Sequence, residues 1–120
     1  MEKISRRLKR SNRILVASHV NPDGDAIGAL IALALALDAL GKAVILYNES
    51  PIPAVYRFLP AVNRIVNRIE DPAVFDTAVV LDCGNIARVG EIAAELEQIP
   101  MVINIDHHVT NTRFGDLHRI

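Results

Sequence analysis

The sequence contains only one cysteine and no tryptophan among its 120 residues. A single cysteine excludes a disulfide within the chain and is typical of a protein from the reducing cytoplasm. Basic and acidic residues nearly balance, 13 against 14, so the chain lacks the overall positive field of a protein that binds duplex DNA non-specifically. The longest apolar run, residues 26–37, is too short to cross a bilayer, and the basic first residues do not resemble a signal peptide. We therefore expect a cytoplasmic protein with no membrane segment in this chain.

The chain alternates apolar runs with helical patterns. We expect strands at residues 13–18, 43–47, 77–81 and 101–105, a weaker strand at 63–69, helices at 1–11, 25–40 and 90–98, a helical turn at 55–58, and a polar tail after residue 108. Gly41 follows the second helical pattern at the usual place for a helix C-terminus. The succession of strand, helix and strand predicts right-handed parallel crossovers. The expected fold class is α/β, a mainly parallel sheet flanked by helices in three layers.

Polar side chains follow three of these predicted strands. Residues 19–25 follow the first strand, Asp82 follows the strand at 77–81, and Asp106-His107-His108 follow the last strand. Ligands of parallel sheets bind beyond the carboxyl ends of the strands, so these groups should converge on one edge. Carboxylates and imidazoles are ligands for divalent metal ions, and the sequence therefore predicts a metal site at that edge.

Each cluster also has a simpler interpretation. Asn-Pro and Asp-Gly in the segment 21–24 are ordinary turn sequences, and an aspartate that opens a helix is an ordinary cap. Asp82 can cap a local turn, and the histidine pair can belong to a polar loop. Cys83 is more typical of a small buried residue than of a nucleophile, because the sequence places no general base beside it. Without a metal site, all of these independent explanations would have to be true at once at one edge of the sheet. The metal site is therefore the favoured interpretation.

Three ordered motifs carry a family resemblance. His19-x-x-Pro-Asp-Gly-Asp25, Asp82 with Arg88-x-Gly90 downstream, and Asp106-His107-His108 resemble the motifs of the DHH phosphoesterase superfamily. The run from Ile105 to Asp116 is most similar to the nanoRNase/pAp phosphatase branch of that superfamily, which also includes RecJ-type nucleases. The resemblance covers residues 14–116.

The resemblance implies two bound metal ions, usually Mn²⁺, with Mg²⁺ or another divalent ion as an alternative. It assigns His19 and Asp23 to the first ion, Asp25 and His107 to the second, and Asp82 to a position between the two ions. His108 would lie close to the phosphoryl group, and Asp106 would position the histidine pair. Arg88 would contact the substrate phosphate.

The activity that the resemblance implies is metal-dependent hydrolysis of short oligoribonucleotides or of 3′-phosphoadenosine 5′-phosphate (pAp). Residues 1–120 would then form the N-terminal part of an incomplete DHH domain, because the family carries a further aspartate and a glycine-rich second domain downstream. A pyrophosphatase or a cyclic-dinucleotide phosphodiesterase of the same superfamily is an alternative. A non-catalytic module that binds metal or nucleotide is another. A homodimer is compatible with the sequence.

Overall fold

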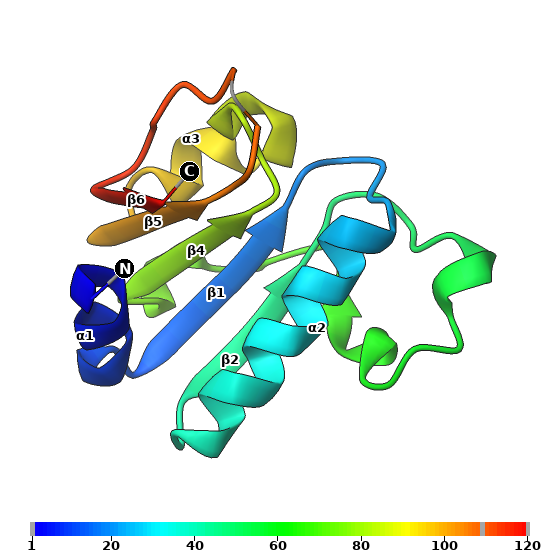
Figure 1. Ribbon diagram of the computed structural model, residues 1–120, viewed down its shortest axis with the longest axis horizontal. Helices are drawn as coiled ribbons and strands as arrows, with labels where there is room; N and C mark the ends of the chain where they lie inside the picture. Colours follow the sequence, from blue (N-terminus) through cyan, green and yellow to red (C-terminus); the bar gives the residue numbers. More distant parts are fainter. Residues whose placement is uncertain (1, 109, 120) are drawn as a thin grey trace.

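The computed structural model describes residues 2–108 and 110–119, and in this part of the chain six strands form one sheet. All the strand pairs are parallel, and the order is β3-β2-β1-β4-β5-β6 (Figure 1). The strands are β1 (Arg13–Ser18), β2 (Ala43–Tyr47), β3 (Ile65–Val66), β4 (Thr77–Leu81), β5 (Met101–Ile105) and β6 (Leu117–Arg119). The predicted α/β class with a parallel sheet is confirmed.

In the described residues, one α-helix precedes β1, and two further α-helices and four short 3₁₀ helices lie between the strands. They are α1 (Glu2–Arg10), α2 (Gly24–Ala39), α3 (Ala93–Leu96), η1 (Ala54–Tyr56), η2 (Val62–Arg64), η3 (Pro72–Val74) and η4 (Ile86–Val89). None of the helices in the described part of the chain is long and apolar enough to pass through a membrane.

The two faces of the sheet are buried by different elements. Ile14 and Val16 of β1 pack with apolar residues of α1 and α2 on one face. Leu15 and Ala17 point to the opposite face and belong to a cluster with residues of η4 and α3. This alternation is what a strand covered on both sides requires, and it gives the expected three layers. Figure 1 shows α2 lying along one face of the sheet beside β1 and β2.

Helix α2 begins and ends through local capping. The Asp23 carboxylate accepts a hydrogen bond from the Ala26 amide at 3.0 Å, which satisfies one of the unpaired amides of the first turn. At the other end Gly41 has a φ of 75°, a left-handed conformation that favours glycine. This turn lets the Lys42 amide donate to the Leu37 carbonyl at 3.1 Å. The N-terminal cap fixes how the chain enters α2 from the loop after β1, and the C-terminal turn directs it toward β2.

Three local expectations were wrong in part. The tail after residue 108 contains β6, in which Leu117 pairs with Ile103 and packs against the cluster on the α1 side. The helix expected at 90–98 is only α3, because Gly90 with a φ of 102° separates it from η4. The strand expected at 63–69 contains only the two residues of β3, since η2 occupies its beginning.

The connections place the carboxyl ends of β1 and β4 next to each other. From β1 the chain moves outward through β2 to β3, and it then returns to the other side of β1 to form β4, β5 and β6. The order of the strands therefore reverses between β1 and β4, and the elements that follow these strands cover opposite faces of the sheet, α2 one face and η4 the other. In α/β sheets this switch point is where ligands bind.

Candidate metal centre

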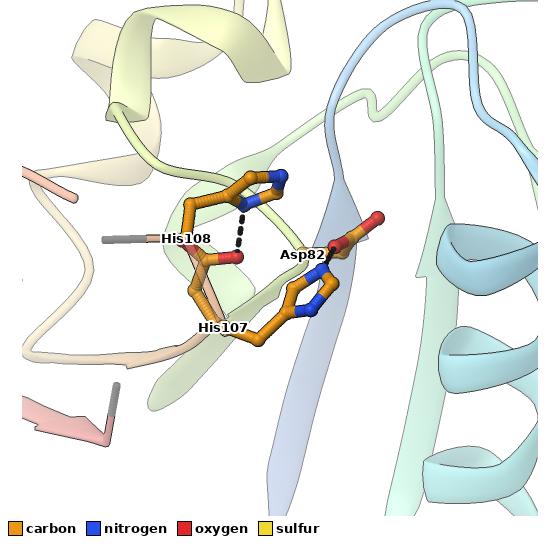
Figure 2. Close-up of side chains that lie close together, drawn as sticks. Asp82, His107 and His108 are labelled. Atoms are coloured by element: carbon orange, nitrogen blue, oxygen red, sulfur yellow. Dashed lines mark hydrogen bonds and ion pairs between the residues drawn. The ribbon is translucent and has the colours of Figure 1, made fainter. Parts of the chain in front are cut away.

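Asp82, directly after β4, lies between two groups of candidate ligands. Its carboxylate Oδ2 is 3.4 Å from Nε2 of His19, and its Oδ1 is 2.9 Å from Nε2 of His107. Figure 2 shows Asp82 and His107 in contact, with His108 beside them. The Asp82 side chain is 9% exposed and the backbone has a φ of 53°, while its amide donates to the Ile105 carbonyl at 3.0 Å. A left-handed backbone is uncommon for a residue other than glycine, and here it aims a carboxylate at both histidines.

The first group consists of His19, Asp23 and Asp82. One ligand atom from each residue lies within 4.8 Å of the others. The Nδ1 atom of His19 lies 2.7 Å from the Val20 carbonyl, and an N–H at that position donates to it. The other ring nitrogen, Nε2, then keeps its lone pair and faces the two carboxylates. Histidine ligands of metal ions are oriented in this way.

Asn48 fixes the backbone of the loop that carries His19. Its buried Nδ2 donates to the His19 carbonyl at 2.7 Å and to the Ser18 hydroxyl at 2.8 Å. Its Oδ1 accepts from the Ser50 amide at 2.9 Å. On the other side of the loop the Val20 amide donates to the Arg88 carbonyl at 2.7 Å. The loop is therefore held from both sides before any ligand binds.

The second group consists of Asp82, Asp106, His107 and His108, again with one ligand atom from each within 4.8 Å of the others. Nδ1 of His108 is 2.6 Å from Oδ1 of Asp106, and the two histidine rings have centroids 4.6 Å apart. Asn111 donates from Nδ2 to Oδ2 of Asp106 at 2.8 Å. Asp106 thus holds His108 while Asn111 holds Asp106.

The surroundings of Asp106 favour its ionised form. Burial alone would raise the pKa of this carboxyl group, but hydrogen bonds from Asn111, His108 and the His107 backbone outweigh burial. The pKa of Asp106 is therefore lower than its ordinary value. An ionised Asp106 accepts a hydrogen bond from Nδ1–H of His108, so the lone pair or proton available for chemistry is on Nε2.

Asp25, also expected at the site, lies outside both groups in the described part of the chain. Asp25 is in the first turn of α2, yet it lines a hollow of about 340 Å³ together with Asp82, Asp106 and His107. Arg88 in η4 has an exposed side chain, and its backbone carbonyl is the acceptor that holds Val20. Thus Asp25 shares the cavity, whereas within the described residues no hydrogen bond or ion pair joins the Arg88 guanidinium to either group.

Cys83 is buried, and its thiol donates to the Asn85 carbonyl at 3.0 Å. Burial raises the pKa of the thiol to about 11, so it stays protonated at neutral pH. This agrees with a structural cysteine and not with a nucleophile.

Two residues that support the site, Asn48 and Asn111, were not predicted from the sequence. Asn48 directly follows β2, so the rule that ligands gather at the carboxyl ends of parallel strands would have identified it. Asn111 has no comparable signal, because it lies in an irregular segment between β5 and β6. Only its hydrogen bond to Asp106 shows its role.

The donor atoms fit a divalent metal ion. Carboxylate oxygens and imidazole nitrogens are both ligands for divalent metal ions, and the two groups share Asp82. Asp82 is nearly buried, and its two carboxylate oxygens face imidazole nitrogens of different loops. Each of the two groups therefore offers carboxylate and imidazole donor atoms that can hold a divalent metal ion.

Comparisons with known proteins agree with this geometry. The model of the DHH family, N-terminal domain, matches residues 13–118. The "Bifunctional oligoribonuclease and PAP phosphatase NrnA" of Thermus thermophilus is 44% identical over 105 residues, which are 88% of this chain and 31% of that protein. The crystal structure of an exopolyphosphatase-related protein from Bacteroides fragilis superposes with a TM-score of 0.91 at 26% identity, over 98% of this chain and 37% of that one. The chain thus spans about a third of the length of both proteins.

Proposed function

Because this chain belongs to the DHH family, we propose that it carries the metal centre of a phosphoesterase that hydrolyses short oligoribonucleotides, pAp or both. The name of the Thermus thermophilus relative supports this choice of substrates. The observation that carries the proposal is Asp82, whose two carboxylate oxygens face His19 on one side and His107 on the other. A carboxylate between two histidine groups is what a pair of neighbouring cations requires.

The proposed resident ions are two Mn²⁺. His19 and Asp23 would hold the first, His107 and Asp25 the second, and Asp82 would contact both. When bound, such a pair neutralises charge on the phosphoryl oxygens and favours deprotonation of the attacking water. The protein's own contribution is to hold four of these ligands on loops and Asp25 in the first turn of α2, where hydrogen bonds and the N-terminal cap of the helix fix the backbone.

His108 is the proposed group beside the phosphoryl oxygens. Asp106 accepts a hydrogen bond from Nδ1 of His108, which fixes the orientation of the ring and leaves Nε2 for the substrate. His108 can then donate a hydrogen bond to a phosphoryl oxygen or a proton to the leaving oxygen. Arg88 is the proposed contact for a substrate phosphate.

The rest of the enzyme is also part of the proposal. Since the chain spans about a third of its relatives, we infer that the complete protein adds the further metal-binding aspartate and a glycine-rich second domain. A cytoplasmic location and a homodimer belong to the same proposal.

The test is Mn²⁺-dependent hydrolysis of a diribonucleotide and of pAp by the complete gene product. We expect Asp82→Ala and His107→Ala to lower kcat about 100-fold or more, because each removes a ligand needed for transition-state stabilisation. His118→Ala is the matched control, since His118 is exposed on β6 and outside both ligand groups, and it should retain the wild-type rate. Rates within a few-fold of wild type for both active-site variants would refute the proposal.

The same assay separates the alternatives. Faster turnover of pyrophosphate or of a cyclic dinucleotide than of the diribonucleotide and pAp would assign the protein to another branch of the superfamily. A nucleotide that raises the melting temperature without any product would indicate a binding module.

A further inference from the structure

A second hollow lies beside the metal centre, at the carboxyl ends of β2 and β3. It has a volume of about 390 Å³, and the polar residues lining it are Asn48, Ser50, Arg57, Asn63 and Asn67. Pro51, Ile52, Val62 and Ile65 supply apolar surface. Cavities of this size and mixed character commonly bind small molecules.

The hollow and the metal centre share a wall. Asn48, which lines the hollow, donates to the carbonyl of His19, and the Ser50 hydroxyl accepts from the Asn21 amide at 2.7 Å. The loop that carries His19 and Asp23 therefore has the metal ligands on one side and this hollow on the other. The hollow is therefore next to the place that a substrate phosphate would occupy at the metal centre.

Among the described residues, none that lines the hollow is acidic, and Arg57 is the only ionisable one. The neighbouring Glu49 is held elsewhere, because its Oε1 accepts from the Glu91 amide at 3.0 Å. Its carboxylate lies against Gly90, where a side chain would collide with it. Because the Glu49 carboxylate is bonded elsewhere, the positive charge of Arg57 is not neutralised by it, and the electrostatic field in the hollow favours an anionic ligand.

The polar side chains offered to a ligand are Arg57, Asn63 and Asn67. All three are exposed, and no hydrogen bond of their side chains was found within residues 2–108 and 110–119. Asparagine amides donate and accept at once, as the edge of a nucleobase requires, whereas Arg57 suits a phosphate. Unpaired RNA is recognised through such base edges together with apolar or stacking contacts.

We propose that this hollow binds the nucleotide unit joined to the phosphate at the metal centre, with Arg57 on a phosphate and Asn63 and Asn67 on the base. The inference rests on the proposed function, and it adds the position from which the substrate is recognised. The residues that line the hollow would thus make the enzyme prefer phosphoesters that carry a nucleoside.

The kinetic test compares a diribonucleotide with bis(p-nitrophenyl) phosphate, a diester without a nucleoside, using the complete gene product. Arg57→Ala and Asn67→Ala should raise KM for the dinucleotide at least 10-fold more than KM for the nitrophenyl ester. Arg10→Ala is the control, because Arg10 lies on α1, which precedes β1 and so lies at the opposite end of the sheet. Equal changes in KM for both substrates, or none for the dinucleotide, would overturn the inference.

A binding measurement separates this inference from the proposed function. Calorimetric titration of AMP into an Asp82→Asn background removes turnover from the experiment. A 10-fold or larger loss of AMP affinity on adding Arg57→Ala supports the hollow even if no hydrolysis is ever found. Unchanged AMP affinity contradicts it even if the protein proves to be an active phosphoesterase.

Discussion

Asp82 combines burial, a left-handed backbone and contact with two histidines. A non-glycine residue with positive φ costs about 1 kcal/mol or more, and a buried carboxylate costs further free energy unless it is paired. Such unfavourable conformations are found mainly at functional sites, where the surrounding structure holds them in place. The hydrogen bond from the Asp82 amide to the Ile105 carbonyl ties this conformation to the end of β5, from which His107 comes.

Asn48 gives the first prediction at this scale. We expect Asn48→Ala to lower the free energy of unfolding by about 2–4 kcal/mol, because the buried His19 carbonyl and Ser18 hydroxyl lose their donor and the Ser50 amide its acceptor. Urea denaturation measures this loss. Asn12→Ala, at an exposed asparagine before β1, should change the stability by less than about 0.5 kcal/mol. Equal effects of the two substitutions would show that Asn48 does not support the loop.

The candidate ligands could be predicted from the sequence at this scale, whereas their supports could not. His19, Asp82 and His107 each follow an apolar run, so their place at the edge of the sheet follows from the strands alone. Asn111 supports Asp106 from an irregular segment, and no periodicity reports such a contact. Hydrogen bonds between side chains far apart in the chain depend on the finished fold.

Among the elements, β4 is tied at its start to the turn between α1 and β1. The carboxylate of Asp76 accepts from the amides of Asn12 and Arg13, both at 2.9 Å, and from the Thr77 hydroxyl at 2.8 Å. Burial raises the pKa of Asp76, but these hydrogen bonds and the charge of Arg7 together lower it by more than burial raises it. The pKa of Asp76 is therefore below its ordinary value. The ionised form therefore stabilises the junction of the two central strands.

This shift predicts a pH dependence. A carboxyl group with a lowered pKa in the folded state contributes stability above the ordinary pKa, near pH 4, and the contribution disappears as the pH falls through the folded value. Asp76→Asn should cost roughly 1 kcal/mol at pH 7, an amount limited by the partial exposure of the group. Urea unfolding at pH 7 and at pH 3 should show that the wild-type advantage over Asp76→Asn shrinks in acid. An advantage that is constant with pH would contradict this account.

The elements that sequence periodicity predicted well are those with continuous apolar runs. The strands β1, β4 and β5 are buried on both faces and α2 is apolar along most of its length, so composition alone marks them. Strand β6 was missed because the pattern of its three residues is short and mostly exposed. Its place comes from pairing with β5, including Leu117 with Ile103, a long-range interaction that local propensity does not contain.

At the scale of the whole molecule, the parallel topology explains how three distant segments form one centre. The loops after β1, β4 and β5 bring together residues that are more than 80 positions apart, His19 and His107, around Asp82. The order of the strands reverses beside β1, and ligands of α/β sheets bind at the carboxyl edge where such a reversal occurs. The fold class and the location of the site at this edge follow from the order of strands and helices in the sequence. The distances between side chains, which distinguish a metal centre from an ordinary polar loop, do not.

The central claim is that these segments surround a pair of metal ions, and counting bound Mn²⁺ tests it most directly. Calorimetry and electron paramagnetic resonance on the complete gene product should give two Mn²⁺ per chain, spin-coupled at a separation of about 4 Å. Asp82→Asn should weaken both sites about 100-fold or more, His19→Ala should weaken one, and His118→Ala should leave both intact. Two ions bound with wild-type affinity by Asp82→Asn, or none bound by the wild-type protein, would contradict the account.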